Sequence, residues 1–192
     1  MNKNTKNYRE AHNMFACNGI LFKHESPRRR ETFVTRKITI AVARIALWQK
    51  EKFYLGNINA KCDWGHAKDY VQMMWMILQA DKAEYWVIAN GETTSVREFV
   101  STAFKEVGIE LDFRVECVNE KGLWPLVITK VISSRSEKKS CLSTLIILGT
   151  QKSIYSLETP LKAKEKLGWA PEHNLASIVK DMMASDLELF KK

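Results

Sequence analysis

Apolar residues recur along the chain at two spacings, and these spacings predict alternating helices and strands. Over residues 33–47 and 66–79 they return every three or four positions, as in an amphipathic helix. Shorter apolar runs at 16–22 and 86–89 are bounded by polar segments, which is typical of buried parallel strands. Residues 23–32 are predicted to be a loop. Because strands alternate with helices, the pattern indicates an α/β fold with a parallel component.

The helix expected over residues 66–79 has one apolar face, and its members are predicted to pack in the core rather than line a cofactor. These members are Ala67, Tyr70, Val71, Met74, Trp75 and Leu78.

Helix start and stop signals define three further segments. Ser95 and Glu98 have the spacing of a capping box, which predicts the start of a helix. An apolar stripe follows them, and Gly108 predicts where this helix ends. Residues 161–167 follow a proline and precede Gly168, as in a short helix. A final amphipathic helix is predicted to run through Leu187. Brief strands are expected at 53–55 and 111–115, whereas residues 132–159 have a composition unlike either flank.

The length and charge of the chain limit the classes of function that fit it. The 192 residues are enough for one ordinary domain, with a net charge of +8. All of that excess lies in residues 1–50, which hold eleven Lys and Arg against three Asp and Glu. A local basic excess indicates a bound anionic ligand or a nucleic-acid-binding arm. Guanidinium groups in a loop before a helix suit phosphate, and Arg28, Arg29 and Arg30 occupy such a loop.

The cysteines and the lack of long apolar runs indicate a cytoplasmic protein. The four cysteines are widely spaced and form no CxxC pair, which argues against a zinc site and fits reduced thiols. No apolar run approaches the ~20 residues that cross a bilayer, and the first residues are polar, unlike a secretory signal. We therefore expect no metal and no membrane association.

Two long ordered motifs carry a resemblance to a known family. The chain reads HESPRR from His24 to Arg29, followed by ETFVTRKI through Ile38, and DWGHAKDYV from Asp63 to Val71. Together with the segments around residues 87–100, 119–122 and 162–169, these runs resemble the GDP-mannose 4,6-dehydratases, which are extended short-chain dehydrogenase/reductases. The resemblance covers roughly residues 7–131 and 160–192.

The resemblance implies an activity and a small set of binding residues. Members of this family convert GDP-mannose to GDP-4-keto-6-deoxymannose, a precursor of fucose and rhamnose sugars, with NADP as the hydride carrier. By resemblance, His24 and Arg29 are expected to contact NADP, and Lys37 is expected to contact GDP. Read without the resemblance, His24 is as well explained as a loop histidine bonded to the backbone, and Arg29 and Lys37 as solvated charges.

The sequence also departs from the family pattern. No GxxGxxG or GxGxxG loop is present, and no Tyr is followed four residues later by Lys, so we assign no catalytic residue. Lys23 and Cys62 stand where the family has Asn and Arg that contact the nucleotide. We therefore expect the carboxyl-terminal part of a Rossmann-like fold, with the last parallel strands and the small substrate-binding subdomain but without the amino-terminal dinucleotide-binding half.

These expectations give a single partial domain over residues 1–192, with two regions inside it, and three functional alternatives. Residues 1–50 are predicted to end the NADP-binding region, and residues 51–192 to form mainly the substrate-binding subdomain, with 132–159 divergent. The leading interpretation is a truncated dehydratase that is inactive alone. A split enzyme completed by a separate amino-terminal partner and a basic nucleic-acid-binding module are the alternatives, and a homo-oligomer stays open.

Overall fold

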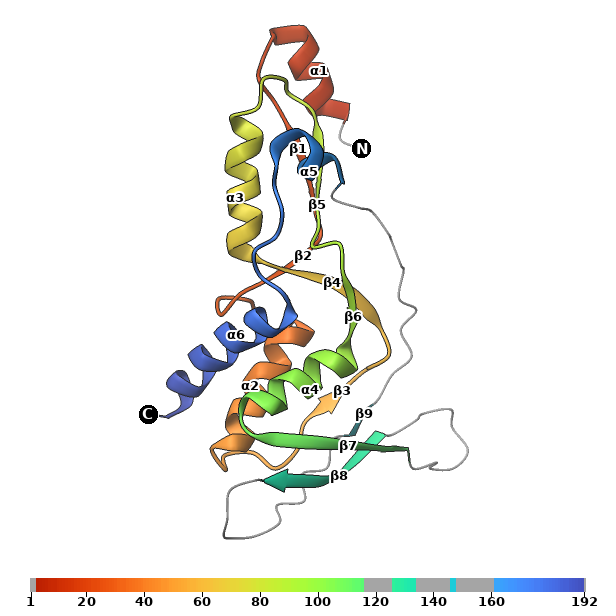
Figure 1. The fold of residues 1–192 in the computed structure, drawn as a ribbon, viewed down its shortest axis with the longest axis vertical. Coiled ribbons are helices and arrows are strands. Elements are labelled where there is room, and N and C mark those ends of the chain that lie inside the picture. The colour runs from red at the N-terminus through yellow and green to blue at the C-terminus, as the bar shows by residue number, and fades with distance from the viewer. Residues whose placement is uncertain (1–2, 116–125, 134–145, 148–160, 192) are drawn as a thin grey trace. The chain divides into compact units, whose positions relative to one another are not determined.

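The computed structural model describes residues 3–115, 126–133, 146–147 and 161–191 (Figure 1). Within these ranges the chain divides into two compact units. Unit 1 combines the described residues of segments 1–25, 63–93 and 156–174, and unit 2 combines those of segments 26–62, 94–155 and 175–192. Neither unit is one continuous stretch of sequence. The predicted boundary at residue 50, between an NADP-binding region and a substrate-binding region, does not coincide with a boundary between these units. It therefore stays a prediction about which ligand each region contacts.

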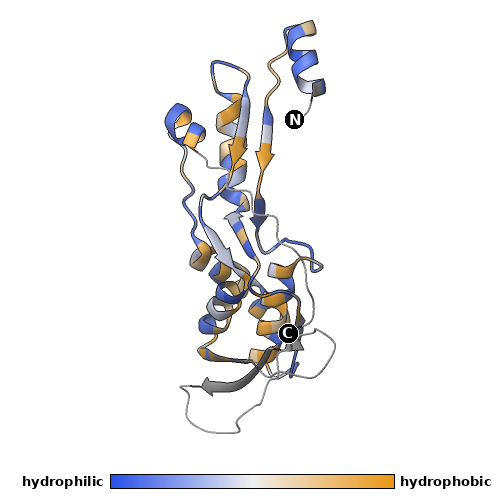
Figure 2. Cartoon of the chain, turned by 90° about the vertical axis from the view of Figure 1, so that its right-hand side faces the viewer, coloured by the Kyte–Doolittle hydropathy of each residue, from blue (hydrophilic) through white to orange (hydrophobic). Residues whose placement is uncertain are grey.

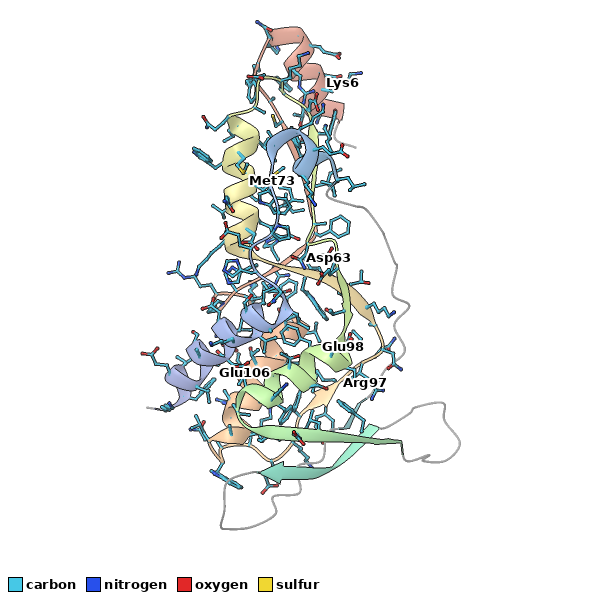
Figure 3. The ribbon with its side chains drawn as sticks, in the orientation of Figure 1. Lys6, Asp63, Met73, Arg97, Glu98 and Glu106 are labelled. Carbon is cyan, nitrogen blue, oxygen red and sulfur yellow. The ribbon has the colours of Figure 1, made fainter. Side chains whose placement is uncertain are left out.

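Unit 1 is built on two parallel strands, β1 (Asn18–Leu21) and β5 (Tyr85–Ile88), which pair from Asn18 opposite Tyr85 to Leu21 opposite Ile88. Three helices belong to this unit: α1 (Lys3–His12), α3 (Ala67–Leu78) and α5 (Leu161–Leu167). The core brings α3, β5 and α5 together, and Met73, labelled in Figure 3, lies on the buried side of α3. Its buried members are Tyr70, Met73, Ile77, Trp86, Ile88, Ala163 and Trp169.

A second sheet contains β2 (Lys23–Glu25), β4 (Lys61–His66) and β6 (Thr93–Ser95), in the order β2-β4-β6. The expectation of a loop over residues 23–32 is therefore wrong for its first three residues. β2 pairs in parallel with β4, so that His24 lies opposite Gly65 and Glu25 opposite His66. Backbone pairing with a distant segment holds these polar residues extended, and an apolar pattern cannot signal such pairing.

Unit 2 has a core of three packed helices, α2 (Val34–Ala46), α4 (Val96–Glu106) and α6 (Leu175–Phe190). The predicted capping box is confirmed, because Ser95 Oγ accepts the N–H of Glu98 at 3.2 Å while Glu98 Oε2 accepts the N–H of Ser95 at 2.6 Å. Gly108 follows the helix at φ +74°, as its stop signal predicts. Hydrophobic and hydrophilic residues along the helices can be followed in Figure 2.

The remaining strands of unit 2 form two small pairs. β3 (Tyr54–Leu55) is parallel to β9 (Ile146–Ile147), and β7 (Ile109–Val115) is antiparallel to β8 (Leu126–Ser133). The strands expected at 53–55 and 111–115 are thus present. Most of the compositionally unusual segment 132–159 lies outside the described residues.

The structure corrects two predictions about burial in unit 1. Residues 16–22 do contain a parallel strand, but Gly19 and Ile20 in β1 are exposed rather than buried. Helix α3 is also turned relative to its predicted apolar face, because its contacts to the core are made by Tyr70, Met73 and Ile77. The neighbouring stripe Val71, Met74, Trp75 and Leu78 is 40–63% exposed. In the described part of the chain, no helix is both long enough and apolar enough to cross a bilayer.

Candidate functional site

Polar residues of unit 1 gather where its parallel strands end. His24 and Glu25 follow β1 along the chain, and Asn90 and Gly91 follow β5. Because β1 and β5 are parallel neighbours, the segments that follow them leave the sheet at the same edge, where ligands of open α/β folds bind. We take this edge as the candidate site of unit 1.

Asp63 holds the segment that follows β5. Its two carboxylate oxygens accept the N–H of Asn90 at 2.9 Å and the N–H of Gly91 at 2.7 Å (Asp63 is labelled in Figure 3). Burial raises the pKa of Asp63, the two backbone hydrogen bonds act to lower it, and the nearby Glu92 charge acts to raise it further. The net shift is upward, so desolvation outweighs the hydrogen bonds. The side chain therefore acts as a clamp on the backbone at residues 90–91.

Tyr70 lies at the centre of the polar cluster in unit 1. A Cβ on Gly65 would lie 2.2 Å from Tyr70 Cε2, so a larger residue at position 65 would displace the ring. Tyr70 is 1% exposed, and among the described residues its hydroxyl has no hydrogen-bond partner. Burial, and then the charges of Asp63, Asp69 and Glu25, raise the pKa of Tyr70 well above its ordinary value. The phenol stays protonated and cannot serve as a general base near neutral pH.

The predicted NADP residue His24 belongs to this cluster. Its ring lies 5.3 Å from the Tyr70 ring, centroid to centroid, and its Nδ1 lies 3.1 Å from the carbonyl oxygen of Phe22. Since a carbonyl can only accept, that hydrogen bond places a proton on Nδ1. The alternative interpretation of His24 as a histidine bonded to the backbone is therefore compatible with its geometry.

A second polar contact in unit 1 holds the segment after α5. The buried carboxylate of Asp69 accepts the backbone N–H of His173 at 3.1 Å and lies 2.6 Å from His173 Nδ1. The His173 ring stacks on the His66 ring, with 4.3 Å between centroids. His66 also begins α3, because its Nδ1 accepts the N–H of Lys68 at 3.1 Å. Among the described residues, no group of His, Cys, Asp and Glu side chains could hold a metal ion.

At the opposite, amino-terminal end of β5 lies a cavity of about 370 Å³, lined by the end of α3, the following turn and α5. Glu84 in its wall bonds both Lys162, at 2.6 Å, and Lys166, at 3.0 Å. These lysines lower the pKa of Glu84 to about 2. Because one carboxylate already contacts both lysines, the charge of the wall is partly neutralised, and we do not assign this cavity to a phosphate.

The other two predicted site residues, Arg29 and Lys37, belong to unit 2. The Arg29 guanidinium lies 3.5 Å from the centroid of the Phe33 ring, in the loop before α2. Phe33 is the N-cap of α2 and provides no side-chain cap. Lys37 is exposed on the second turn of α2. A partly buried guanidinium near a helix start that lacks a side-chain cap is suited to an anion such as phosphate.

Sequence reasoning missed Asp63, Tyr70 and Asp69 as site residues, although it quoted the motif that contains all three. Asp63 and Asp69 act through hydrogen bonds that span the sequence, to residues 90–91 and to His173. The Tyr70 ring lies beside the ring of His24, which is also distant in the sequence. The one local signal was Gly65 five residues before Tyr70. A glycine in a strand often marks a close approach, and here the approaching group is the Tyr70 ring.

The chain shares the α/β fold of about half of several solved structures. A Pseudomonas aeruginosa structure described as RMD complexed with NADPH aligns with a TM-score of 0.72 at 12% identity, covering 97% of this chain and 52% of that one. The dTDP-glucose 4,6-dehydratase of Bacillus anthracis in complex with NAD aligns with a TM-score of 0.65 at 11% identity, covering 95% and 48%. At such identities the likeness defines the fold class.

The sequence comparison is more specific. The sequence model of the GDP-mannose 4,6 dehydratase family matches residues 1–182, so the chain belongs to the GDP-mannose 4,6-dehydratase family. The GDP-mannose 4,6 dehydratase of Dictyostelium discoideum is 50% identical over 185 residues, which is 96% of this chain and 49% of that protein. The chain spans about half the length of the curated relatives it matches. Since the family match includes the basic first fifty residues, a nucleic-acid-binding module is not favoured.

Proposed function

We propose that this chain supplies the carboxyl-terminal, substrate-binding part of a GDP-mannose 4,6-dehydratase. The reaction is the loss of water from GDP-mannose to give GDP-4-keto-6-deoxymannose, and it makes the enzyme a carbon–oxygen lyase. The single observation that carries the proposal is the family match over residues 1–182. Its support from the structure is the fold, which is shared with the RMD structure solved with NADPH and with a dTDP-glucose 4,6-dehydratase solved with NAD.

The proposed binding residues fit the charges of the ligands. Arg29 and Lys37 would neutralise phosphate oxygens, Arg29 on NADP and Lys37 on the diphosphate of GDP-mannose. The start of α2, where Phe33 provides no side-chain cap, supports this assignment, because the N–H groups at a helix start favour anions. His24 would contact NADP through its second ring nitrogen. When bound, NADP supplies the hydride acceptor and donor that the reaction needs.

The chain is proposed to bind and orient ligands rather than to move the proton. It has no YxxxK pair and no glycine-rich dinucleotide loop, and the buried Tyr70 keeps its proton. In this proposal residues 1–50 border NADP, residues 51–192 mainly surround the sugar nucleotide, and the chain alone is inactive. Turnover then requires a glycine-rich dinucleotide loop and a YxxxK pair, neither of which residues 1–192 contain.

A turnover assay and a binding assay test separate parts of the proposal. GDP-mannose and NADP are incubated with the chain alone and with the chain co-expressed with the part of the Dictyostelium relative outside the matched segment. We expect the keto-deoxy product only in the second case. Product formation by the pure chain alone would contradict the assigned division of labour.

The binding assay measures the affinity of the co-expressed preparation for GDP by calorimetry. Lys37→Met should weaken GDP binding about three- to tenfold, because one charged contact to phosphate is lost. Lys180→Met changes another exposed lysine of unit 2, on α6, and should leave the affinity unchanged. Equal affinities in the two variants would remove Lys37 from the site.

A further inference from the structure

The aromatic ring of Tyr70 contacts both the backbone of β4 and the side chain of His24. Gly65 of β4 lies opposite His24 of β2, so the side-chain positions of these two residues share one face of the sheet. A Cβ on Gly65 would lie 2.2 Å from Tyr70 Cε2, so the phenol ring rests directly on the β4 backbone. The same ring lies 5.3 Å from the His24 ring, centroid to centroid, at an interplanar angle of 42°. Tyr70 therefore occupies the place beside His24 that a side chain at position 65 would fill.

Two contacts together restrict the imidazole of His24. Its Nδ1 lies 3.1 Å from the carbonyl oxygen of Phe22, so the proton of the neutral ring is on Nδ1. β2 has only three residues and His24 is half-buried, so backbone pairing alone leaves the side chain free to turn about its torsions. The Tyr70 ring packs beside the imidazole and limits these torsions, which keeps Nδ1 within reach of Phe22. The orientation of the His24 ring therefore depends on a residue that follows it by more than forty positions in the sequence.

The ring of Tyr70 acts on His24, and its hydroxyl does not. Tyr70 is 1% exposed, and among the described residues its hydroxyl has no hydrogen-bond partner. Burial, and then the charges of Asp63, Asp69 and Glu25, raise the pKa of this phenol, so it stays neutral. A neutral ring without a hydrogen bond orients its neighbour by packing alone. Phenylalanine should therefore replace Tyr70 in this role, whereas a flexible aliphatic side chain such as methionine should not.

From these contacts we propose that Tyr70 is a positioning residue, whose ring rests on Gly65 and holds the imidazole of His24 in one orientation and one tautomer. Its effect on cofactor binding rests on the proposed function, in which His24 contacts NADP. With the proton on Nδ1, the Nε2 of His24 can only accept a hydrogen bond from the cofactor. A ring that is already oriented loses less conformational entropy when the ligand binds, so the packing by Tyr70 raises the affinity.

Nuclear magnetic resonance of the full chain tests the orientation without any ligand. At about pH 8, where an ordinary histidine is neutral, we expect the nitrogen-15 shifts of the Nδ1–H tautomer at His24 and an Overhauser contact between the ring protons of His24 and Tyr70. Tyr70→Phe should leave the tautomer unchanged, whereas Tyr70→Met should shift it toward Nε2–H, which histidine favours in water. Ile77→Ala is the matched control, because Ile77 lies on the same helix and in the same core cluster as Tyr70. It should weaken the core without changing the tautomer.

A binding assay measures the consequence for the cofactor. NADP is titrated by calorimetry into the full chain and its variants, and Tyr70→Met should weaken NADP binding about three- to tenfold, which corresponds to one neutral hydrogen bond. The affinity for GDP should stay unchanged, because Lys37, the proposed GDP contact, lies on α2 of unit 2. Combined with His24→Ala, Tyr70→Met should cause no further loss of NADP affinity, because the side chain through which Tyr70 acts is gone.

The outcomes separate this inference from the proposed function. A tautomer that changes in Tyr70→Met but not in Ile77→Ala, with no effect on NADP affinity, supports the positioning role and counts against His24 as an NADP contact. An Nε2–H tautomer at His24 in the parent chain, or no Overhauser contact with Tyr70, overturns the positioning role. Equal changes in Tyr70→Met and Ile77→Ala also overturn it, because general loosening of the core would explain both. A further loss of NADP affinity in the double variant does the same.

Discussion

Helix α2 ends in a hydrogen-bond pattern that normally requires glycine, but the chain has tryptophan there. The N–H of Trp48 donates to Ile45 O at 3.0 Å, and the N–H of Gln49 donates to Arg44 O at 2.9 Å. With Leu47 as the C-cap, these two bonds form a Schellman motif whose C′ residue is Trp48. Trp48 accordingly has φ +61°, in the left-handed region that glycine enters without strain.

The expected gain from Trp48→Gly follows from the backbone and the exposure of the side chain. A left-handed conformation costs a non-glycine residue about 1–2 kcal/mol. Glycine avoids this cost, but about 0.5–1 kcal/mol of the gain is lost, because glycine loses more conformational freedom on folding than other residues do. The Trp48 side chain is 70% exposed, so its removal gives up little packing. We therefore expect Trp48→Gly to stabilise unit 2 by about 0.5–1 kcal/mol, against the rule that most substitutions destabilise.

A glycine in the same unit allows the opposite substitution to be tested. Gly108 occupies the corresponding position after α4 at φ +74°, and a Cβ there would meet no atom within 4 Å. Gly108→Ala therefore tests the backbone cost without a steric clash, and it should destabilise unit 2 by about 1 kcal/mol. Urea unfolding followed by circular dichroism at 222 nm measures both variants.

At constant m, the urea midpoint should rise by about 0.3–0.5 M for Trp48→Gly and fall by a similar amount for Gly108→Ala. Trp48→Ala is the control, because it removes the indole but keeps a Cβ, and its midpoint should lie near that of the parent. If Trp48→Gly instead lowers the midpoint, the reasoning is refuted. The strain relieved at the left-handed residue would then be smaller than the combined cost of losing the indole contacts and of the greater flexibility of glycine in the unfolded chain.

Two further predictions concern charged groups. Asp186 is fully buried and is paired with Arg36, which is 6% exposed. Asp186→Ala should lower the free energy of unfolding by about 3–5 kcal/mol, because it leaves a buried guanidinium without its partner. In urea unfolding, the double variant Arg36→Met with Asp186→Leu should recover most of that loss. A single-variant loss below about 1 kcal/mol would mean that water reaches the site. Lys162 and Lys166 hold the pKa of Glu84 at about 2, below its ordinary 4.5, so its contribution to stability is present above pH 4.5 and is lost as the pH falls toward 2. An NMR titration of Glu84 checks this, and an ordinary pKa would show that the two ion pairs do not persist in solution.

The sequence predicted those elements whose signals are local. The capping box at Ser95, the stop at Gly108 and the short helix before Gly168 depend on residues within one or two turns, and the structure confirms all three. β4 was missed because its buried residues include Asp63 and His66, which no apolar pattern selects. β2 was missed for a related reason, since it is defined by pairing with β4 and not by its own composition.

Helix α3 shows most clearly what periodicity cannot decide. Tyr70, Met73 and Ile77 are one apolar stripe of this helix, and Val71, Met74, Trp75 and Leu78 are an adjacent one. A pattern repeating every 3.6 residues identifies both, but only the position of the sheet decides which is buried. The site shows the same limit, because resemblance indicated His24, Arg29 and Lys37, whereas Asp63 and Tyr70 gain their roles from contacts that span the sequence.

The two units differ in how completely each buries its own apolar surface. In unit 2 the helices α2, α4 and α6 pack on one another and enclose even the ion pair between Arg36 and Asp186. In unit 1 one sheet edge and one stripe of α3 stay exposed, and the clamp by Asp63 and the buried Tyr70 belong to this same unit. Local stability follows buried apolar contacts, so unit 1 is expected to open at a lower urea concentration than unit 2.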